Sequence, residues 1–348
     1  MPAQAGIQKS RTRIPAQMIP SKHNSDAPSS WRPSASIETL HARARIIKSI
    51  RDFFTSRGVM EVETPLMCHT SVTDTFIQSI PALFQSQPHE KEQRYYLQTS
   101  PEYAMKRLLA AGSGAIFQIC KAFRQGEVGR FHNPEFTMLE WYRPGFDHHA
   151  LMDEMDELLQ MVLNKPAAER KSYSEVFLQY LQINPHTASL EELKACASAN
   201  HISVAEDIQD RDTWLQILMS EFIELRIGQD RPFFIYDFPA SQAALARIQP
   251  GTPPVASRFE VYFRSIELAN GFHELQDAGE QRKRFENNLI RRKELGLNLL
   301  DIDEFFLSAL EHGLPDCSGV ALGIDRLIML ATHSNNIANV LTFDFSRA

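Results

Sequence analysis

Two strand-like segments joined by a polar loop place the strongest constraint on the fold of this chain. Residues 115–124 and 136–143 are rich in aliphatic and aromatic side chains, and the charged loop 125–133 separates them. The loop is too short to hold the helix of a crossover between parallel strands, so we expect the two strands to be antiparallel neighbours. The segments therefore predict an antiparallel sheet with an unusually long, charged hairpin tip.

The rest of the chain supplies more strands and the helices that flank them. A serine cap (Ser34 or Ser36) precedes a helix that Gly58 ends, and Ser100 with Pro101 begins a helix that runs to residue 112. Further strands are predicted at 59–65, 95–97, 233–238, 259–268 and 319–322, and further helices at 281–295 and 324–332. This mixture predicts an α+β fold, with a mostly antiparallel sheet flanked by helices.

Composition divides the chain into a tail and one domain. Residues 1–30 are rich in Pro, Ser, Gln, Lys and Arg without a hydrophobic period, so we expect a disordered N-terminal tail. Residues 31–348 are long enough and, in a chain that is 43% hydrophobic, apolar enough for one large domain. Within it, residues 150–230 have a polar helical pattern that predicts a helical insertion.

Charge and cysteine content narrow the class of protein. The net charge is −7, and since the first thirty residues have four basic side chains and one acidic, the remainder carries −10, which disfavours a general nucleic-acid surface. No run approaches the length of a membrane span, and the N-terminus has no apolar signal core, so we expect a cytoplasmic protein. Neither a zinc knuckle nor a disulfide framework fits the four scattered cysteines: Cys68, Cys120, Cys196 and Cys317.

Charged side chains at strand positions suggest binding sites. Glu140 and Tyr142 alternate onto one face of a strand, where a carboxylate and a phenol form a wall suited to an amine. Arg124 ends the preceding strand, where its guanidinium can grip a phosphate or carboxylate with two hydrogen bonds. Glu267 and Glu274 flank what looks like a turn at Asn270, and two carboxylates there suit Mg²⁺.

Near the C-terminal end, two glycines precede a helix. Gly319 and Gly323 are followed by Arg326 in the first helical turn, and both close backbone approach and the helix N-terminus favour an anion. Each of these features alone is more often a surface ion pair or a close packing contact. Their joint order along the chain is what favours a functional interpretation.

That order resembles the three motifs of class II aminoacyl-tRNA synthetases, at residues 58–65, 123–124 and 319–326. Residues 131–142 and 267–275 are similar to the lysyl branch of that class. A narrower resemblance is to the elongation factor P (R)-β-lysine ligases, stand-alone relatives of lysyl-tRNA synthetase; it lies at 99–103, 238–242 and 315–323. A lysyl-tRNA synthetase would carry an anticodon-binding OB-fold before this domain, and thirty tail residues are too few to build one.

The resemblance implies roles for individual residues. Arg124 and Arg326 are the implied catalytic residues; Arg124 would hold the α-phosphate, and Arg326 would sandwich the adenine against Phe136. The implied ATP-binding residues are Arg124, Gln125, Gly126, Asn133, Phe136, Glu267, Leu268, Gly323 and Arg326. The implied amino-acid pocket comprises Ser100, Pro101, Glu102, Tyr142, Asn270 and Glu274, and the implied Mg²⁺ ligands are Glu267 and Glu274.

The resemblance also implies a reaction with ATP as co-substrate. (R)-β-lysine or lysine would be activated as an adenylate and transferred to a lysine ε-amine of elongation factor P, by a homodimer formed through residues 58–65. Two other interpretations stay open: a minimal lysyl-tRNA synthetase, and a non-catalytic synthetase-like regulatory module. The module is disfavoured because both motif arginines are present.

Two positions depart from the expected pattern. Gly126 stands where the second motif usually has an acid, and Glu127 follows one place later, so the adenine contact would come from backbone or from Glu127. Ala321 stands where lysyl-tRNA synthetases have glycine. An added methyl in a pocket can shift an amino group by about one carbon, so we expect Ala321 to favour β-lysine over α-lysine.

Overall fold

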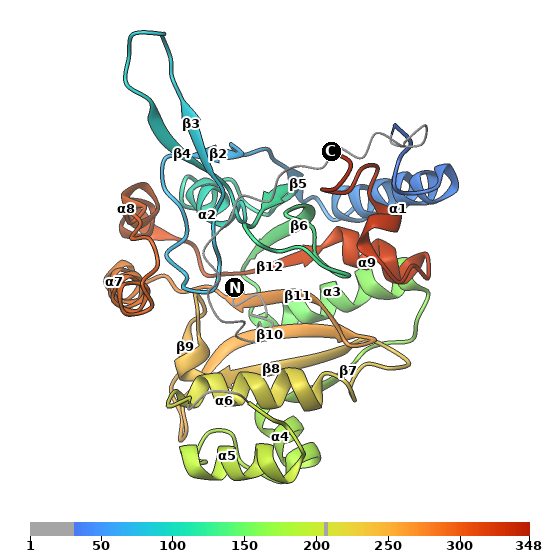
Figure 1. Ribbon diagram of the computed structural model, residues 1–348, viewed down its shortest axis with the longest axis vertical. Coiled ribbons are helices and arrows are strands. Elements are labelled where there is room, and N and C mark those ends of the chain that lie inside the picture. The colour runs from blue at the N-terminus through green and yellow to red at the C-terminus, as the bar shows by residue number, and fades with distance from the viewer. Residues whose placement is uncertain (1–30, 205–207) are drawn as a thin grey trace, which may run out of the picture.

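The computed structural model describes residues 31–204 and 208–348, and the predicted tail lies outside these ranges. Within them, nine strands form one sheet in the order β1-β5-β6-β12-β11-β10-β8-β7, with β9 paired to β10 (Figure 1). Most neighbours are antiparallel; β1 with β5 and β7 with β8 are parallel. The strands are β1 (Met60–Glu61), β5 (Ile116–Phe123), β6 (Glu135–Pro144), β7 (Glu169–Ser172), β8 (Phe233–Pro239), β9 (Ile248–Gln249), β10 (Val255–Phe263), β11 (Ile266–His273) and β12 (Cys317–Gly323). The predicted α+β class with a mostly antiparallel sheet is confirmed.

The hairpin predicted for residues 115–143 is present. β5 and β6 are antiparallel over eight paired positions, from Ile116 opposite Tyr142 to Phe123 opposite Glu135. Two other strand predictions need correction. The segment 59–65 pairs only at Met60–Glu61, and the segment 259–268 is a hairpin of β10 and β11 rather than one strand. Arg264 and Ser265 make that turn in the left-handed region, with φ of 50° and 60°, which the apolar pattern did not reveal.

The predicted helices form close to their expected bounds. They are α1 (Ile37–Thr55), α2 (Glu102–Ala110), α7 (Ala278–Glu294) and α9 (Ile324–Ala331). Ser36 rather than Ser34 caps α1, since its side chain accepts from the Thr39 N–H. The strand predicted at 95–97 is part of β4 (Gln93–Leu97). The sequence did not predict α8 (Glu304–Gly313) or the strands β2 (Met67–Cys68) and β3 (Pro81–Phe84), which pair with β4 in a small sheet that projects from the body as an arm (Figure 1).

The interval 150–230 is mostly helical. It contains α3 (His148–Leu163), α4 (Tyr173–Leu181), α5 (Leu190–Ala199), α6 (Arg211–Leu218) and a π-helical turn at Met219–Ile223. Helices α4, α5 and α6 lie together at the β8 end of the sheet (Figure 1). However, α3 packs on the main sheet, and β7 extends that sheet beside β8. No described helix is long and apolar enough to cross a membrane.

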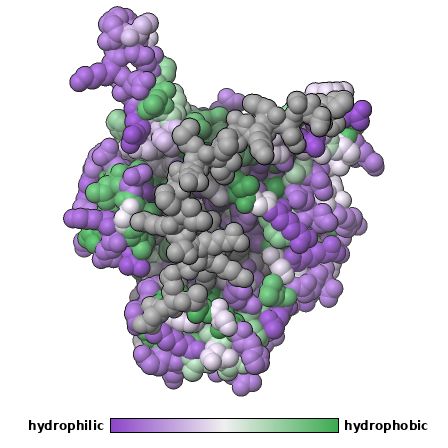
Figure 2. Space-filling view, in the orientation of Figure 1, coloured by the Kyte–Doolittle hydropathy of each residue, from purple (hydrophilic) through white to green (hydrophobic). Residues whose placement is uncertain are grey.

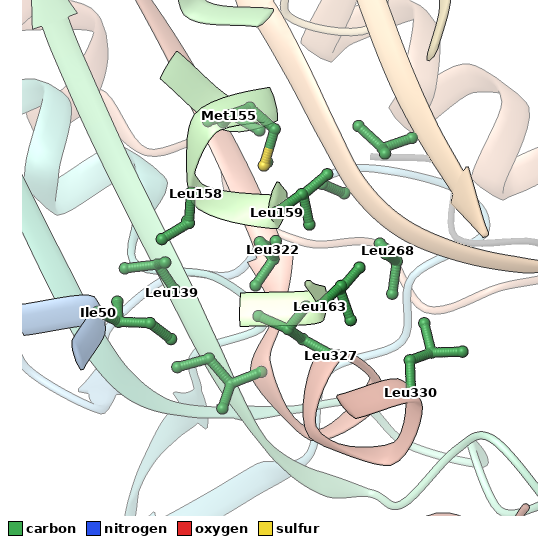
Figure 3. Packing of buried hydrophobic residues seen from close by; sticks show 14 of the residues in the cluster. Ile50, Leu139, Met155, Leu158, Leu159, Leu163, Leu268, Leu322, Leu327 and Leu330 are labelled. Atoms are coloured by element: carbon green, nitrogen blue, oxygen red, sulfur yellow. The ribbon is translucent and has the colours of Figure 1, made fainter. Parts of the chain in front are cut away.

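One face of the sheet is covered by α1, α3 and α9. Leu139 and Leu322 project from β6 and β12 into this core, where they meet Leu159 of α3 and Leu327 of α9 (Figure 3). Side chains alternate along a strand, so the residues between them project to the opposite face. Packing one face with leucines therefore leaves the other face of the same strands available for a polar site.

Shortening a leucine in this core should lower stability without touching that site. Leu159 is fully buried, so Leu159→Ala is expected to reduce the free energy of unfolding by about 2–5 kcal/mol. Urea denaturation of purified protein measures this loss. The matched control is Leu178→Ala on α4, because Leu178 is 48% exposed and should lose little. Equal losses in the two variants would contradict the assigned core.

Candidate active site

A row of residues crosses the face of the sheet opposite α1, α3 and α9. Backbone register places Gln118, Glu140, Ala321, Asn270 and Glu260 opposite one another, on β5, β6, β12, β11 and β10 in turn. All five are buried or nearly so. Five strands thus bring together side chains that are far apart in the sequence. Two pockets lie along this row.

The first, the arginine pocket, is lined by Arg124, Asn133, Phe136, Glu267, Leu268, Gly323 and Arg326 among others. The Arg124 guanidinium carbon lies 5.1 Å from the centroid of the Phe136 ring. Arg326 donates to the Glu267 carbonyl at 2.8 Å and to the Phe131 carbonyl at 3.2 Å. The predicted nucleotide residues therefore come together, except that Gln125 and Gly126 are not among the residues that line this pocket.

A histidine that the sequence analysis did not identify also contacts Arg326. His132 Nε2 lies 2.7 Å from Arg326 Nη2. Burial, and then the nearby guanidinium of Arg326, lowers the pKa of His132 to about 4. His132 is therefore neutral at physiological pH and accepts a hydrogen bond from Arg326. His132 lies within the segment 131–142 that resembles the lysyl branch, and this position was the sequence signal that could have identified it.

Glu127 supplies the acidic side chain that the second motif usually has at the position of Gly126. Glu127 lines the arginine pocket, and its Oε1 is 3.7 Å from Arg124 Nη1. Gly126 has φ of +82°, a conformation that an acidic residue would adopt only with strain. The glycine thus makes the turn, and the carboxylate one place later reaches the pocket.

Glu267 and Glu274, which the sequence analysis predicted to share one metal ion, lie at opposite ends of β11. Asn270 and Gly271 are not a turn but lie within β11, and a strand rises about 3.3 Å per residue, so Glu267 and Glu274 are separated by about 20 Å along the chain. The charged groups that act on Glu267 include Glu260 and Arg326, whereas those that act on Glu274 include Lys106 and Glu102. The two carboxylates belong to different pockets.

A carboxylate that the sequence analysis missed lies beside Glu267. Burial, and then the negative charge of Glu260, raises the pKa of Glu267 to about 7. Glu260 itself accepts hydrogen bonds from Asn270 Nδ2 at 3.0 Å, from Tyr262 and from Arg258. Because the hairpin turn between β10 and β11 was not recognised, nothing in the sequence pattern placed Glu260 across from Asn270.

The second, the carboxylate pocket, comprises Ser100, Glu102, Glu140, Tyr142 and Glu274. Glu140 accepts from the Tyr142 hydroxyl at 2.6 Å and from the Ser100 hydroxyl at 2.7 Å, which confirms that Glu140 and Tyr142 share a face. Burial and the neighbouring Glu102 raise the pKa of Glu140 to about 7. Pro101 precedes α2 and so sets the position of Glu102 in its first turn.

A lysine connects the other two acids of the carboxylate pocket. Lys106 Nζ lies 2.7 Å from Glu102 Oε1 and 2.6 Å from Glu274 Oε2. Burial, opposed by the Lys106 charge and reinforced by Glu102, raises the pKa of Glu274 to about 8. The sequence analysis did not identify Lys106, although its spacing of four residues from Glu102 on a helix was a usable signal.

Arg124 joins the two pockets. It lines the arginine pocket, and it also lines a cleft of about 1080 Å³ that opens onto Ser100 and Glu102. Its side chain is nearly buried, with 7% of the residue exposed. A guanidinium at this junction can contact an anion in the first pocket and a second anion that enters from the other.

Asp325 stabilises the arginine pocket through hydrogen bonds to neighbouring elements. It accepts from the Thr137 backbone N–H at 2.7 Å and from Arg43 of α1 at 2.6 Å. Arg43 also donates to the Thr137 hydroxyl at 2.8 Å. This buried network fixes α1, β6 and α9 relative to one another, and so holds Phe136 and Arg326 at a set separation.

Comparison with known proteins decides the family. The family profile of tRNA synthetases class II (D, K and N) matches residues 29–347. The chain belongs to this family. The class II assignment agrees with the sheet and with the order of the three motifs along it.

Three curated relatives of this class II chain carry the name elongation factor P–(R)-β-lysine ligase. One from Vibrio parahaemolyticus is 57% identical over 316 residues, covering 90% of this chain and 98% of the relative. Another from Vibrio cholerae is 56% identical over 321 residues, covering 92% and 99%. A third from Hamiltonella defensa is 52% identical over 319 residues, covering 91% and 98%. The relatives thus match this class II chain over nearly their full length.

Proposed function

We propose that this enzyme uses ATP to activate (R)-β-lysine, or lysine, and transfers it to the ε-amine of a lysine in elongation factor P. The observation that carries the proposal is the junction at Arg124, which lines both the arginine pocket and the cleft that opens onto Ser100 and Glu102 of the carboxylate pocket. The name shared by relatives with 52–57% identity supplies the amino acid and the acceptor. With ATP and a translation factor as substrates, we expect the reaction to take place in the cytoplasm.

In the first step, the arginine pocket binds ATP and the carboxylate pocket binds the diamine. Phe136 and Arg326 hold the adenine between them, and Arg124 contacts the α-phosphate. The carboxylate oxygen of the amino acid attacks the α-phosphorus, the bond to the bridging oxygen breaks, and pyrophosphate leaves with the electron pair. Arg124 stabilises the negative charge that develops on the α-phosphate oxygens.

In the second step, the acceptor amine of elongation factor P attacks the acyl carbon of the adenylate. An amide bond forms, AMP leaves with the electron pair, and the amine loses its proton. A free lysine amine has a pKa near 10.4, so docking must favour its neutral form. The large cleft beside Ser100 and Glu102 gives such a side chain access to the junction.

Mg²⁺ fits the arginine pocket through a single carboxylate. Burial, and then the negative charge of Glu260, raises the pKa of Glu267, and a divalent cation would stabilise its ionised form. No group of three or more metal-ligating side chains is assembled among the described residues, and Mg²⁺ on a nucleotide needs only one or two carboxylates plus phosphate oxygens. We therefore assign Mg²⁺ to Glu267, where it would offset phosphate charge, and assign Glu274 to the diamine alone.

The test is to incubate the purified enzyme with ATP, (R)-β-lysine and elongation factor P, and then to weigh the factor by mass spectrometry. The expected result is a mass gain of one β-lysyl residue, dependent on ATP. Charging of tRNA without a mass gain would favour the minimal lysyl-tRNA synthetase. Absence of diamine-dependent pyrophosphate exchange would favour the non-catalytic module.

Ala321 should set the preference between the two lysine isomers. It lies in the cross-strand row between Glu140 and Asn270, so its methyl group stands between the two pockets. In Ala321→Gly, the ratio of kcat/KM for (R)-β-lysine to that for α-lysine is expected to fall by about 10–200-fold. Pyrophosphate exchange with each isomer measures the ratio. An unchanged ratio would show that Ala321 does not discriminate.

We also infer a homodimer formed through the first motif. β1 lies at the edge of the main sheet, and Met60 on it is 49% exposed. On the neighbouring arm, Met67 is 41% and Phe84 is 44% exposed, and Figure 2 shows hydrophobic surface on the arm below its hydrophilic tip. Apolar side chains around an open strand edge favour burial against a second copy.

A further inference from the structure

Three buried carboxylates share one pocket with one buried ammonium group. Glu102, Glu140 and Glu274 are 9%, 2% and 1% exposed, and Lys106 is 1% exposed. Like charges in a buried site repel one another strongly, so three carboxylates cannot be held together without compensation. Among the described residues, Lys106 is the cation whose charge acts on both Glu140 and Glu274.

The Lys106 contacts are geometrically specific. Its ammonium contacts Glu102 on its own helix and Glu274 beyond the end of β11, so it links α2 to the sheet. Each of these carboxylates has one oxygen on Lys106. The other oxygen of Glu274, Oε1, is the one that would lie 2.6 Å from a Cβ added at Gly319, and therefore faces the Tyr142 side of the pocket.

The net charge of the carboxylate pocket is complementary to the two ammonium groups of the proposed substrate. Three carboxylates and one ammonium leave a charge of −2 when all are ionised. A diamine acid brings two ammonium groups to this pocket, while its own carboxylate goes to Arg124. The surrounding carboxylates raise the pKa of Lys106, so the ammonium keeps its charge despite burial.

We propose that Lys106 is a positioning residue for diamine recognition, which orients Glu102 and Glu274 and cancels one of the three negative charges. This inference rests on the proposed function for the identity of the substrate. Without Lys106, Glu102 and Glu274 would repel each other and their side chains would move apart. The pocket would then no longer bind a diamine in one defined orientation. Lys106 itself does not touch the reacting atoms.

The test compares Lys106→Met, which keeps length and apolar bulk, with Arg107→Met. Arg107 is the next residue on α2 and is exposed, so its replacement removes a charge from the same helix outside the pocket. Isothermal calorimetry with L-lysine, without ATP or acceptor, is expected to show at least 30-fold weaker binding in Lys106→Met and less than threefold change in Arg107→Met. ATP binding should change less than threefold in both.

Chemical rescue separates positioning from a role in folding. In Lys106→Ala, millimolar n-propylamine should restore lysine binding at least tenfold, because its ammonium can occupy the vacated position, whereas 1-propanol should not. Lysine binding within threefold of wild type in Lys106→Met would overturn the proposal. So would parallel losses of lysine binding, ATP binding and thermal stability that no amine reverses. A wild-type protein that binds lysine but leaves elongation factor P unmodified would refute the transfer reaction and not this inference.

Discussion

Replacing Arg124 by methionine is expected to lower kcat/KM for adenylate formation by about 10²–10³-fold, the effect typical of losing one preorganised donor to a developing negative charge. Arg124 lines both pockets and has 7% of its surface exposed, so no other group can simply move into its place. Diamine-dependent pyrophosphate exchange measures the loss. Because Arg124 acts mainly in the transition state, the fall should be larger in kcat than in the KM for ATP.

A matched control lies on the same strand. Lys121 of β5 has a 41% exposed side chain that pairs with Glu135 outside the pockets. Lys121→Met removes a positive charge three residues away and should leave pyrophosphate exchange within about twofold of wild type. If both variants lost activity alike, the general charge of the hairpin, rather than the Arg124 position, would be responsible.

Gly319→Ala is expected to raise the KM for the diamine by at least about 100-fold, since misplaced pocket groups cost that much in rate or affinity. A Cβ at Gly319 would lie 2.2 Å from the Tyr142 ring and 2.6 Å from Glu274 Oε1. Either the phenol or the carboxylate must move, and both belong to the carboxylate pocket. The KM for ATP should change much less, because the arginine pocket lies beyond Ala321.

Gly129→Ala provides the comparison for this substitution. A Cβ at Gly129 would meet nothing within 4 Å, and its backbone does not require glycine. Its diamine KM should stay within about threefold of wild type. A similar rise in the two variants, or equal rises in the KM for ATP and for the diamine in Gly319→Ala, would refute the assignment of Gly319 as the residue that leaves room for Tyr142 and Glu274.

The sequence predicted those parts of the site that lie on regular, recognisable elements. Arg124, Glu140 and Tyr142 belong to a hairpin whose two strands have clear apolar patterns, so alternation alone placed them correctly. Arg326 follows the glycines at the start of a helix, and it too lies where expected. In each case the information is local, within about thirty residues of sequence.

The errors share a cause, which is pairing between distant segments. Glu260 was missed because the left-handed turn at Arg264 and Ser265 has no glycine to mark it. The contact of Glu274 with Lys106 was not foreseen because the two residues are far apart in sequence and only the folded sheet brings them together. Such contacts depend on register and not on composition, so one sequence read alone does not reveal them.

The place of β12 in the sheet has a consequence for biosynthesis. Residues 317–323 lie between β6 and β11. Until these residues have left the ribosome, the strands up to β6 and the strands from β7 to β11 have no backbone hydrogen bonds to each other through this position. A nascent or C-terminally truncated polypeptide therefore has two half-sheets and neither finished pocket. Catalytic competence is acquired in one final closing step, and fragments that end before this strand should be inert toward both ATP and lysine.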